Sequence, residues 1–204
     1  TGRIFSILYS EHFENRATVK AGELIAAGAI GKVVSTAGFG PHRLRAPTRP
    51  EWFFKRERYG GILVDIASHQ CEQFLFFTGS DAADILSATV SNRANSQFPG
   101  LQDSGDIHLS TADADGFIRV DWFTPEGLPS WGDGRLFITG TEGAIELRKN
   151  IDVAGREGGN HLFLSDKKGV QYIDCSNVQL PYGAQLLADI RNRAETAMPQ
   201  ARCY

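Results

Sequence analysis

The sequence is poor in several residue types and patterns, and each scarcity excludes a class of protein. Its 204 residues include only three cysteines, which lie far apart and form no CxxC pair, so neither a disulfide framework nor a zinc knuckle is predicted. No apolar run approaches the length of a membrane span, and no signal segment opens the chain. The net charge of −3 gives no overall field that would attract nucleic acid or an anionic membrane. We expect a soluble protein of a reducing compartment, the cytoplasm.

A glycine motif for binding phosphate is also missing. The glycine clusters at 60–61, 132–134 and 155–159 have the wrong spacing for GxGxxG or lack the strand, turn and helix that it needs. No repeat, low-complexity tract or long linker interrupts the chain, which predicts one domain over residues 1–204. Because the first residue is not Met and both ends stop abruptly, we expect a domain truncated at both ends.

The most informative stretch that is present is YGGILVDIASHQCEQFLFFTG, at residues 59–79. A helix is predicted there with Asp65 in its first turn and His69 four residues later, which places both side chains on one helix face. A carboxylate so placed orients an imidazole and stabilises its charge, as a proton-transfer site requires. Alternatively, Asp65 only caps the helix and satisfies a partly buried His69. A metal site of His69, Cys71 and Glu72 is less favoured, because no second ligand cluster has zinc-like spacing.

The rest of the pattern predicts an α+β fold. A strand at 2–10, a helix at 14–31 and a strand at 32–40 precede the helix that carries His69. A last helix is expected at 183–197. Between them, β-rich runs separated by short turns occur at 84–93, 105–111, 117–124, 135–141, 144–149, 161–166 and 170–175. We therefore expect a large, mainly antiparallel open sheet with helices packed on one face.

Apolar residues on both faces of one expected strand predict an interface. Ile118, Val120 and Trp122 alternate with Phe117 and Phe123, so the face that the helices leave free also carries apolar surface. Burial of that face by a second copy predicts a homo-oligomer, a dimer or a tetramer.

A basic segment lies between Pro41 and Tyr59. Six arginines and lysines face only two glutamates there and are interleaved with three aromatic residues. Two interpretations stay open: a solvated loop whose arginines pair locally, or a site for an anionic or polyhydroxylated ligand.

Three stretches together resemble the Gfo/Idh/MocA oxidoreductases, named for glucose-fructose oxidoreductase and inositol dehydrogenase: the Gly-Gly and Asp-x-x-x-His segment, the preceding PEWFFKRERY, and the passage GELIAAGAIGKVV. In that family an N-terminal Rossmann domain holds NAD or NADP, and a C-terminal domain with a large open sheet carries the substrate site and the oligomer interface. The resemblance implies the second part alone, since GxGxxG and the family's Lys-Pro motif, which supplies an active-site lysine, are both missing here.

The resemblance also implies roles for five residues. Asp65 and His69 match the family's Asp and His on the helix that borders the nicotinamide and the substrate, so both are expected to be catalytic. Glu72 falls where many members have Asp, Tyr9 matches the Tyr of the family's opening segment, and His12 takes the place of an Arg. These three are expected to contact substrate.

The implied reaction oxidises a secondary alcohol of a sugar, cyclitol or related polyol, or runs in reverse, with hydride passing to or from a nicotinamide. His69, oriented by Asp65, would be the general base. NAD or NADP is expected in the full-length protein and none in this chain, which should be inactive alone. Four further residues that follow the second strand or lie in Gly-rich loops are expected to contact substrate: His42, Arg43, Trp131 and His161.

Two other functions remain open. The first is a non-catalytic carbohydrate-binding or scaffold module that kept the fold after losing its cofactor domain. The second is a metal-dependent hydrolase that uses His69, Glu72 and either His12 or His161, although we expect no metal.

Overall fold

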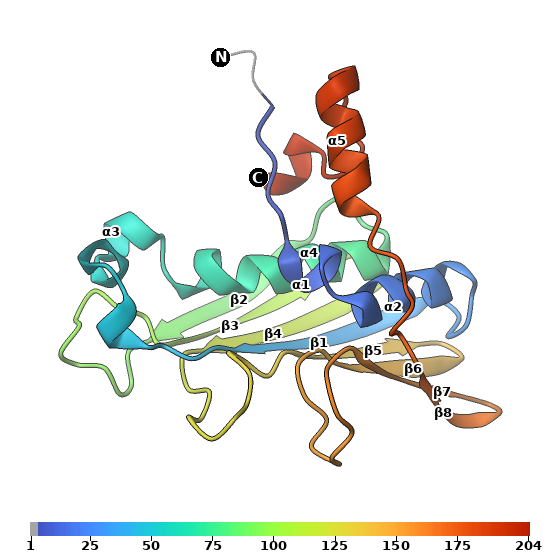
Figure 1. Cartoon of the computed structure of the whole chain (residues 1–204), viewed down its shortest axis with the longest axis horizontal. Helices are drawn as coiled ribbons and strands as arrows, with labels where there is room; N and C mark the ends of the chain where they lie inside the picture. The colour runs from blue at the N-terminus through green and yellow to red at the C-terminus, as the bar shows by residue number, and fades with distance from the viewer. Residues whose placement is uncertain (1–3) are drawn as a thin grey trace.

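A computed structural model describes residues 4–204, and in it eight strands form one sheet (Figure 1). The strands are β1 (Val33–Pro41), β2 (Asp84–Ser91), β3 (Ser104–Ser110), β4 (Asp115–Asp121), β5 (Arg135–Gly140), β6 (Gly143–Arg148), β7 (His161–Asp166) and β8 (Gly169–Ile173). Their order in the sheet is β2-β3-β4-β1-β5-β6-β7-β8. Every neighbouring pair is antiparallel except β1 and β4, which run parallel. The predicted mainly antiparallel open sheet is confirmed.

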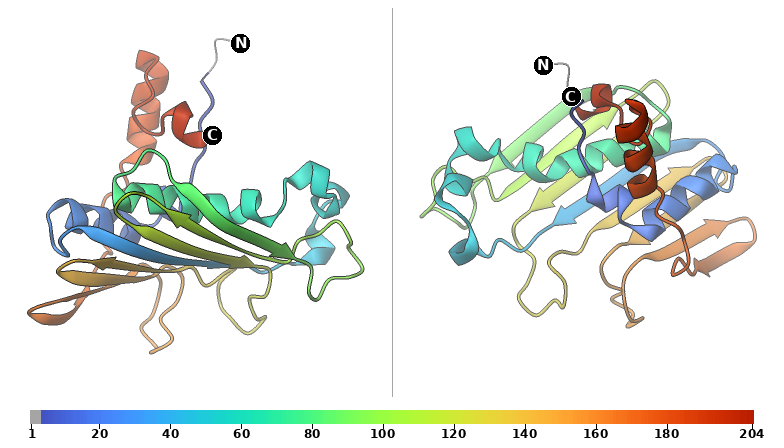
Figure 2. Two further views of the ribbon diagram at one scale, coloured as in Figure 1. Left: turned by 180° about the vertical axis from the view of Figure 1, so that it is seen from behind. Right: turned by 45° about the horizontal axis from the view of Figure 1, so that its top comes forward.

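Helices cover one face of the sheet and leave the other face open (Figures 1 and 2). They are α1 (Ser10–Phe13), α2 (Arg16–Ala26), α3 (Arg56–Tyr59), α4 (Ser68–Thr78) and α5 (Tyr182–Asn192). Short 3-10 segments occur at Ala46–Thr48, Glu51–Phe54 and Gln200–Cys203, and a π-helical turn at Leu63–Ala67. Helix α5 projects away from the sheet, on the side where the described part of the chain begins and ends. Among residues 4–204, no helix is long and apolar enough to cross a membrane.

Glycines let helix α4 lie directly against the middle of the sheet. A Cβ atom at Gly116 of β4 would come within 2.7 Å of the Phe74 ring, and one at Gly40 of β1 within 2.8 Å of Gln70 Nε2. Phe74 is 1% exposed and belongs to the same core cluster as Ile118. Small residues at these strand positions therefore set how closely α4 approaches the sheet.

The alternation expected from Phe117 onward is present in β4. Ile118 and Val120 are buried in the core between helices and sheet, while Phe117 points to the open face. There Phe39 lies between two other aromatic rings, with centroids 6.1 Å from Phe117 and 6.2 Å from Phe137. The open face thus carries a cluster of partly exposed aromatic side chains.

Some boundaries expected from sequence were wrong. The expected strand at 2–10 is irregular over residues 4–9, and residues 2 and 3 lie outside the described part. The helix expected at 14–31 is α2, which begins only after Asn15, whose side-chain oxygen accepts a hydrogen bond of 2.9 Å from the N–H of Thr18. The last helix ends at Asn192, because the next residue adopts a left-handed conformation.

Candidate active site

His69 lies in the first turn of α4 and is half buried. Its Nδ1 atom is buried and has no hydrogen-bond partner among residues 4–204. The ring of Tyr9 meets the imidazole edge-on, with the two centroids 5.6 Å apart. A buried, unpartnered ring nitrogen is costly unless a ligand or water completes it, so this position has the features of a functional residue.

Asp65 does not orient His69 in the way that the spacing predicted. It lies in the π-helical turn before α4, is exposed, and makes no hydrogen bond to His69. Partial desolvation of its carboxyl group by the surrounding protein raises the pKa of Asp65 above 3.8, against the opposing charges of Arg49 and His42. The π-helical turn is itself informative, because such turns occur frequently at functional sites.

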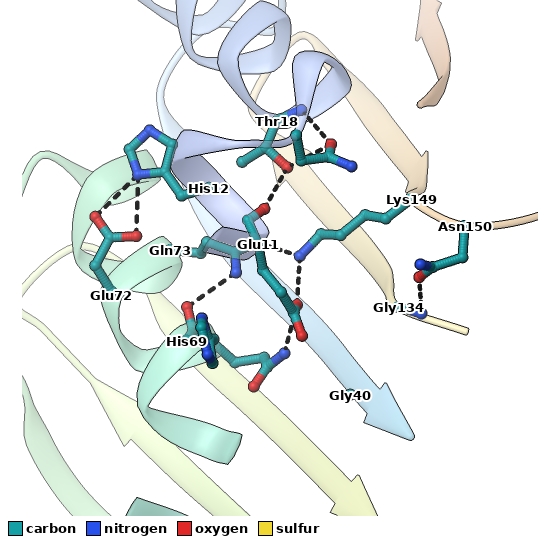
Figure 3. A network of polar contacts seen from close by, with 12 residues as sticks. Glu11, His12, Thr18, Gly40, His69, Glu72, Gln73, Gly134, Lys149 and Asn150 are labelled. Carbon is teal, nitrogen blue, oxygen red and sulfur yellow. Dashed lines mark hydrogen bonds and ion pairs between the residues drawn. The ribbon is translucent and has the colours of Figure 1, made fainter. Parts of the chain in front are cut away.

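A buried polar network underlies His69 (Figure 3). Glu11 Oε2 accepts hydrogen bonds of 2.8 Å from Lys149 Nζ and 2.8 Å from Gln70 Nε2. Lys149 Nζ also donates to Gln73 Oε1 at 2.6 Å, and Gln73 Nε2 donates to the backbone oxygen of His69 at 2.9 Å. The side chains of Lys149 and Glu11 are only 4% and 5% exposed. These hydrogen bonds connect the first turn of α4, which carries His69, to the ion pair of Glu11 and Lys149.

This environment sets the protonation of His69 and Glu11. Burial is the largest cause that lowers the pKa of His69 below 6.5; Glu11 opposes it, and the charges of Lys149 and His42 act with it. Burial alone would raise the pKa of Glu11, but Lys149, His69 and His42 together lower it below 4.5. At neutral pH the site therefore holds a neutral imidazole close to an ionised carboxylate, an arrangement suited to accepting a proton.

His12 and Glu72, both expected to contact substrate, pair with each other instead. His12 Nδ1 lies 3.0 Å from both carboxylate oxygens of Glu72, and the side chains are 9% and 5% exposed. The His12 ring also packs on Phe13 and Phe76, with centroids 4.4 Å and 4.0 Å away. The pair joins α1 to α4, which makes it a structural contact in this arrangement.

His42 and Trp131 lie together at the end of β1. Their rings are 4.4 Å apart, and His42 Nδ1 lies 3.0 Å from the backbone oxygen of Gly40. The backbone N–H of Arg43 donates a hydrogen bond of 2.8 Å to the Trp131 oxygen. Its guanidinium donates to three backbone oxygens of the loop before β5, those of Pro125, Glu126 and Leu128, and so holds that loop in place.

His161, which was expected to contact substrate, lies in the interior of the domain. This residue is 1% exposed, and both ring nitrogens have partners, the Tyr172 hydroxyl at 3.1 Å and the Gly158 oxygen at 3.0 Å. This buried imidazole holds the loop before β7 in place, and neither of its ring nitrogens is available to a ligand. Trp131, by contrast, is 47% exposed.

Sequence reasoning missed Glu11, Gln70, Gln73 and Lys149. Gln70 and Gln73 lie on α4 and are only 3% and 0% exposed. No local signal marks Glu11 or Lys149, which are 138 residues apart in the chain. Within residues 4–204, no group of three His, Cys, Asp or Glu side chains is placed to hold a metal ion.

A comparison with family models matched residues 18–146 to the GFO/IDH/MocA C-terminal domain. Among solved structures, an oxidoreductase from Erwinia carotovora atroseptica SCRI1043 is 43% identical in sequence, with a TM-score of 0.95. The match covers 100% of this chain and 61% of that one. A comparison with curated proteins found no match.

Two more distant structures share the fold. One is an oxidoreductase from Agrobacterium radiobacter in complex with NAD+, L-tartaric acid and magnesium, at 17% identity and a TM-score of 0.72, covering 95% of this chain and 57% of that one. The other is the aldose-aldose oxidoreductase of Caulobacter crescentus complexed with glycerol, at 20% identity and a TM-score of 0.75, covering 99% and 58%. The chain thus spans about three fifths of the length of these relatives.

Proposed function

The chain belongs to the Gfo/Idh/MocA family as its C-terminal domain, and on that basis we propose that it forms the substrate half of a longer NAD(P)-dependent oxidoreductase. The reaction is oxidation of a secondary alcohol of a sugar, cyclitol or related polyol, or its reverse. The observation that carries the proposal is His69, a half-buried imidazole with an unpartnered nitrogen beside the ionised Glu11. The Caulobacter relative, an aldose-aldose oxidoreductase, supports a sugar substrate by likeness of fold.

His69 acts as the general base in the oxidising direction. The alcohol O–H proton passes to the imidazole, and the C–H hydrogen leaves as hydride with the electron pair of its bond. The carbon and oxygen then form the C=O bond of a ketone. NAD or NADP, when bound, supplies the hydride acceptor. The neutral state of His69 suits this step, because burial lowers its pKa below 6.5. The Glu11 carboxylate stabilises the imidazolium that results.

The nicotinamide nucleotide would be bound mainly by another domain. No GxGxxG motif occurs in this sequence, so nothing here would cradle a pyrophosphate. In this proposal the domain alone is inactive, and the protein works in the cytoplasm, where its three free cysteines stay reduced.

The test uses the full-length gene product, screened against a panel of sugars and cyclitols for reduction of NAD and NADP. We expect His69→Ala to lower kcat by about 10² or more, because a positioned base contributes roughly 10² to 10⁴. Wild-type kcat in His69→Ala would refute the assignment. Absence of turnover with every polyol, combined with sugar binding, would instead favour the non-catalytic carbohydrate-binding module.

We also propose that the open face of the sheet is covered by a second copy of the chain. The aromatic cluster of Phe39, Phe117 and Phe137 is partly exposed there in the monomer, and exposed apolar clusters of this kind usually mark an interface. Sedimentation of the full-length protein should give a dimer or tetramer, and Phe137→Arg should shift it toward monomer. A monomeric wild-type protein would contradict the proposal.

A further inference from the structure

The strand at one margin of the sheet, β2, is exposed along almost its whole length. Figure 2 shows it, in green, at the edge of the sheet, and among residues 4–204 only β3 pairs with it. Seven of its eight residues are exposed, and Ile85, Leu86 and Val90 are 66%, 64% and 43% exposed. The free edge of β2 therefore combines uncovered apolar side chains with backbone N–H and C=O groups that have no neighbouring strand.

The apolar side chains of β2 include a row on the face that helices cover elsewhere in the sheet. The register with β3 sets three residues of β2 opposite positions of that face: Ile85 opposite Leu109, Ala88 opposite Ile107, and Val90 opposite Gly105. Leu109 and Ile107 are each 5% exposed in the core, and a Cβ atom at Gly105 would come within 2.7 Å of the Leu63 side chain. The helical layer thus reaches β3 and leaves the row on β2 uncovered.

Little in the sequence of β2 protects this edge. Natural proteins protect free edge strands by short length, lysine, proline or bulges. β2 is eight residues long and contains no lysine, arginine or proline. Its one charged residue is Asp84 at its start, and its one irregularity is a register shift between Ile85 and Ser87. The strand at the opposite margin, β8, has only five residues and directly follows Lys167 and Lys168. Of the two margins, β2 is the one suited to pairing with another strand.

The residues of β2 are complementary to themselves in the antiparallel direction. The register shift leaves Leu86 out of the ladder with β3, so seven residues form it and Ala88 is the middle one. A second β2, related to the first by a twofold axis through Ala88 and perpendicular to the sheet, keeps like faces together. Ile85 then lies opposite Val90 of the second copy, and Ala88 lies opposite its own equivalent. The uncovered apolar row of each copy is covered by the same row of the other.

The opposite face of the strand fits the same register. Ser87 lies opposite Thr89 of the second copy, and Asp84 lies opposite Ser91. No like charges meet, and hydroxyl side chains face each other, as is favourable for cross-strand pairs. Both faces therefore accept the second copy of β2 in one register.

We propose that β2 pairs antiparallel with β2 of a second copy of this chain, so that two eight-stranded sheets join edge to edge. This contact uses a different surface from the open face of the sheet. Two different twofold contacts on one chain produce a tetramer, in which each copy uses both surfaces. The edge contact depends neither on the dehydrogenase function nor on the open-face contact.

A cysteine at the middle of the strand gives the most specific test. Facing Cα atoms of an antiparallel pair lie about 4.5 or 5.5 Å apart, which is within the span of a disulfide. Ala88→Cys in the full-length protein should therefore form a covalent dimer under mild oxidation, and peptide mass spectrometry should locate the link between the two introduced cysteines. Val170→Cys, on β8 and 75% exposed before substitution, is the matched control, and should give roughly tenfold less covalent dimer. Equal yields from the two variants would overturn the proposal.

A charge on the apolar row tests the same contact without a cross-link. Ile85 is 66% exposed in the single chain, so Ile85→Lys should fold normally but place an ammonium group where the second copy packs. Sedimentation velocity of the full-length protein should then show halved mass relative to wild type, whereas Val170→Lys on β8 should leave the mass unchanged. Wild-type mass in Ile85→Lys would contradict the edge contact.

Combining variants separates the two surfaces. If both contacts form, Ile85→Lys and Phe137→Arg should each leave dimers, and the double variant should be a monomer. A wild-type dimer that Ile85→Lys dissociates and Phe137→Arg does not would support the edge contact and remove the open-face one. The reverse result would show that something other than a second copy covers β2, and would refute the proposal. None of these readouts involves turnover, so the dehydrogenase function can fail while the edge contact stands.

Discussion

Lys149 Nζ lies 2.8 Å from Glu11 Oε2, in an ion pair whose side chains are 4% and 5% exposed. The pair joins α1 to the residue that follows β6, so it connects the start of the domain to the far half of the sheet. Because Gln70 and Gln73 bond to the same two side chains, the pair also fixes the first half of α4. The buried charges of Glu11 and Lys149 are compensated by each other and by the side-chain amides of Gln70 and Gln73.

The first prediction concerns stability. Lys149→Met should lower the free energy of unfolding by about 3 to 5 kcal/mol, because it leaves the Glu11 carboxylate buried without a compensating charge. Glu11→Gln combined with Lys149→Met should recover most of that loss, since no buried charge then remains. Urea unfolding of both variants measures the difference. A single variant as stable as wild type would show that water reaches the pair.

The second prediction is the pH dependence of stability. The folded-state pKa of Glu11 is lowered below 4.5, so the folded state binds fewer protons than the unfolded state. Its stabilising contribution is therefore fully present above pH 4.5 and is lost as the pH falls through the lower folded-state pKa. The loss of stability between neutral and acid pH should be smaller in the Glu11→Gln, Lys149→Met double variant than in wild type. Equal slopes in urea titrations at several pH values would contradict this.

Local patterns in the sequence predicted much of the fold correctly. Runs rich in β-branched and aromatic residues, separated by short turns, identified the seven strands after α4. Gly79 correctly marked the end of α4, where it adopts a left-handed conformation with φ of 66° that glycine accepts without strain. The irregular segment at 4–9 was misread because Ile7 and Tyr9 pack against α5 rather than in a sheet.

The site was harder to predict, because its partners come from distant parts of the chain. The spacing of Asp65 and His69 suggested that one orients the other. In the structure Asp65 lies in the π-helical turn, and the negative charge that most raises the pKa of His69 is that of Glu11 on α1. Contacts such as Glu11 to Lys149 depend on how α1 and β6 are brought together by tertiary packing. No periodicity within a short window can report them.

The third prediction is the pH profile of the proposed oxidation. The base must be neutral to accept a proton, and burial lowers the pKa of His69 below 6.5. The value of kcat/KM for polyol oxidation by the full-length enzyme should therefore fall on the acid side with an apparent pKa below 6.5. His69→Ala should lose this acid limb together with most of its activity. An acid limb retained in His69→Ala would assign it to another group.

The fourth prediction separates Glu11 from Asp65 as the electrostatic partner of His69. The negative charge of Glu11 raises the pKa of His69 against the larger effect of burial, whereas the charge of Asp65 is not among the causes that shift it. Glu11→Gln should therefore move the acid limb of kcat/KM to lower pH, and the unpaired Lys149 that it leaves acts in the same direction. Asp65→Asn should leave the limb where it is. Both variants should be checked by thermal unfolding, so that the profile is measured only where the protein is folded. A limb that moves in Asp65→Asn and stays fixed in Glu11→Gln would restore the pairing that the sequence spacing suggested.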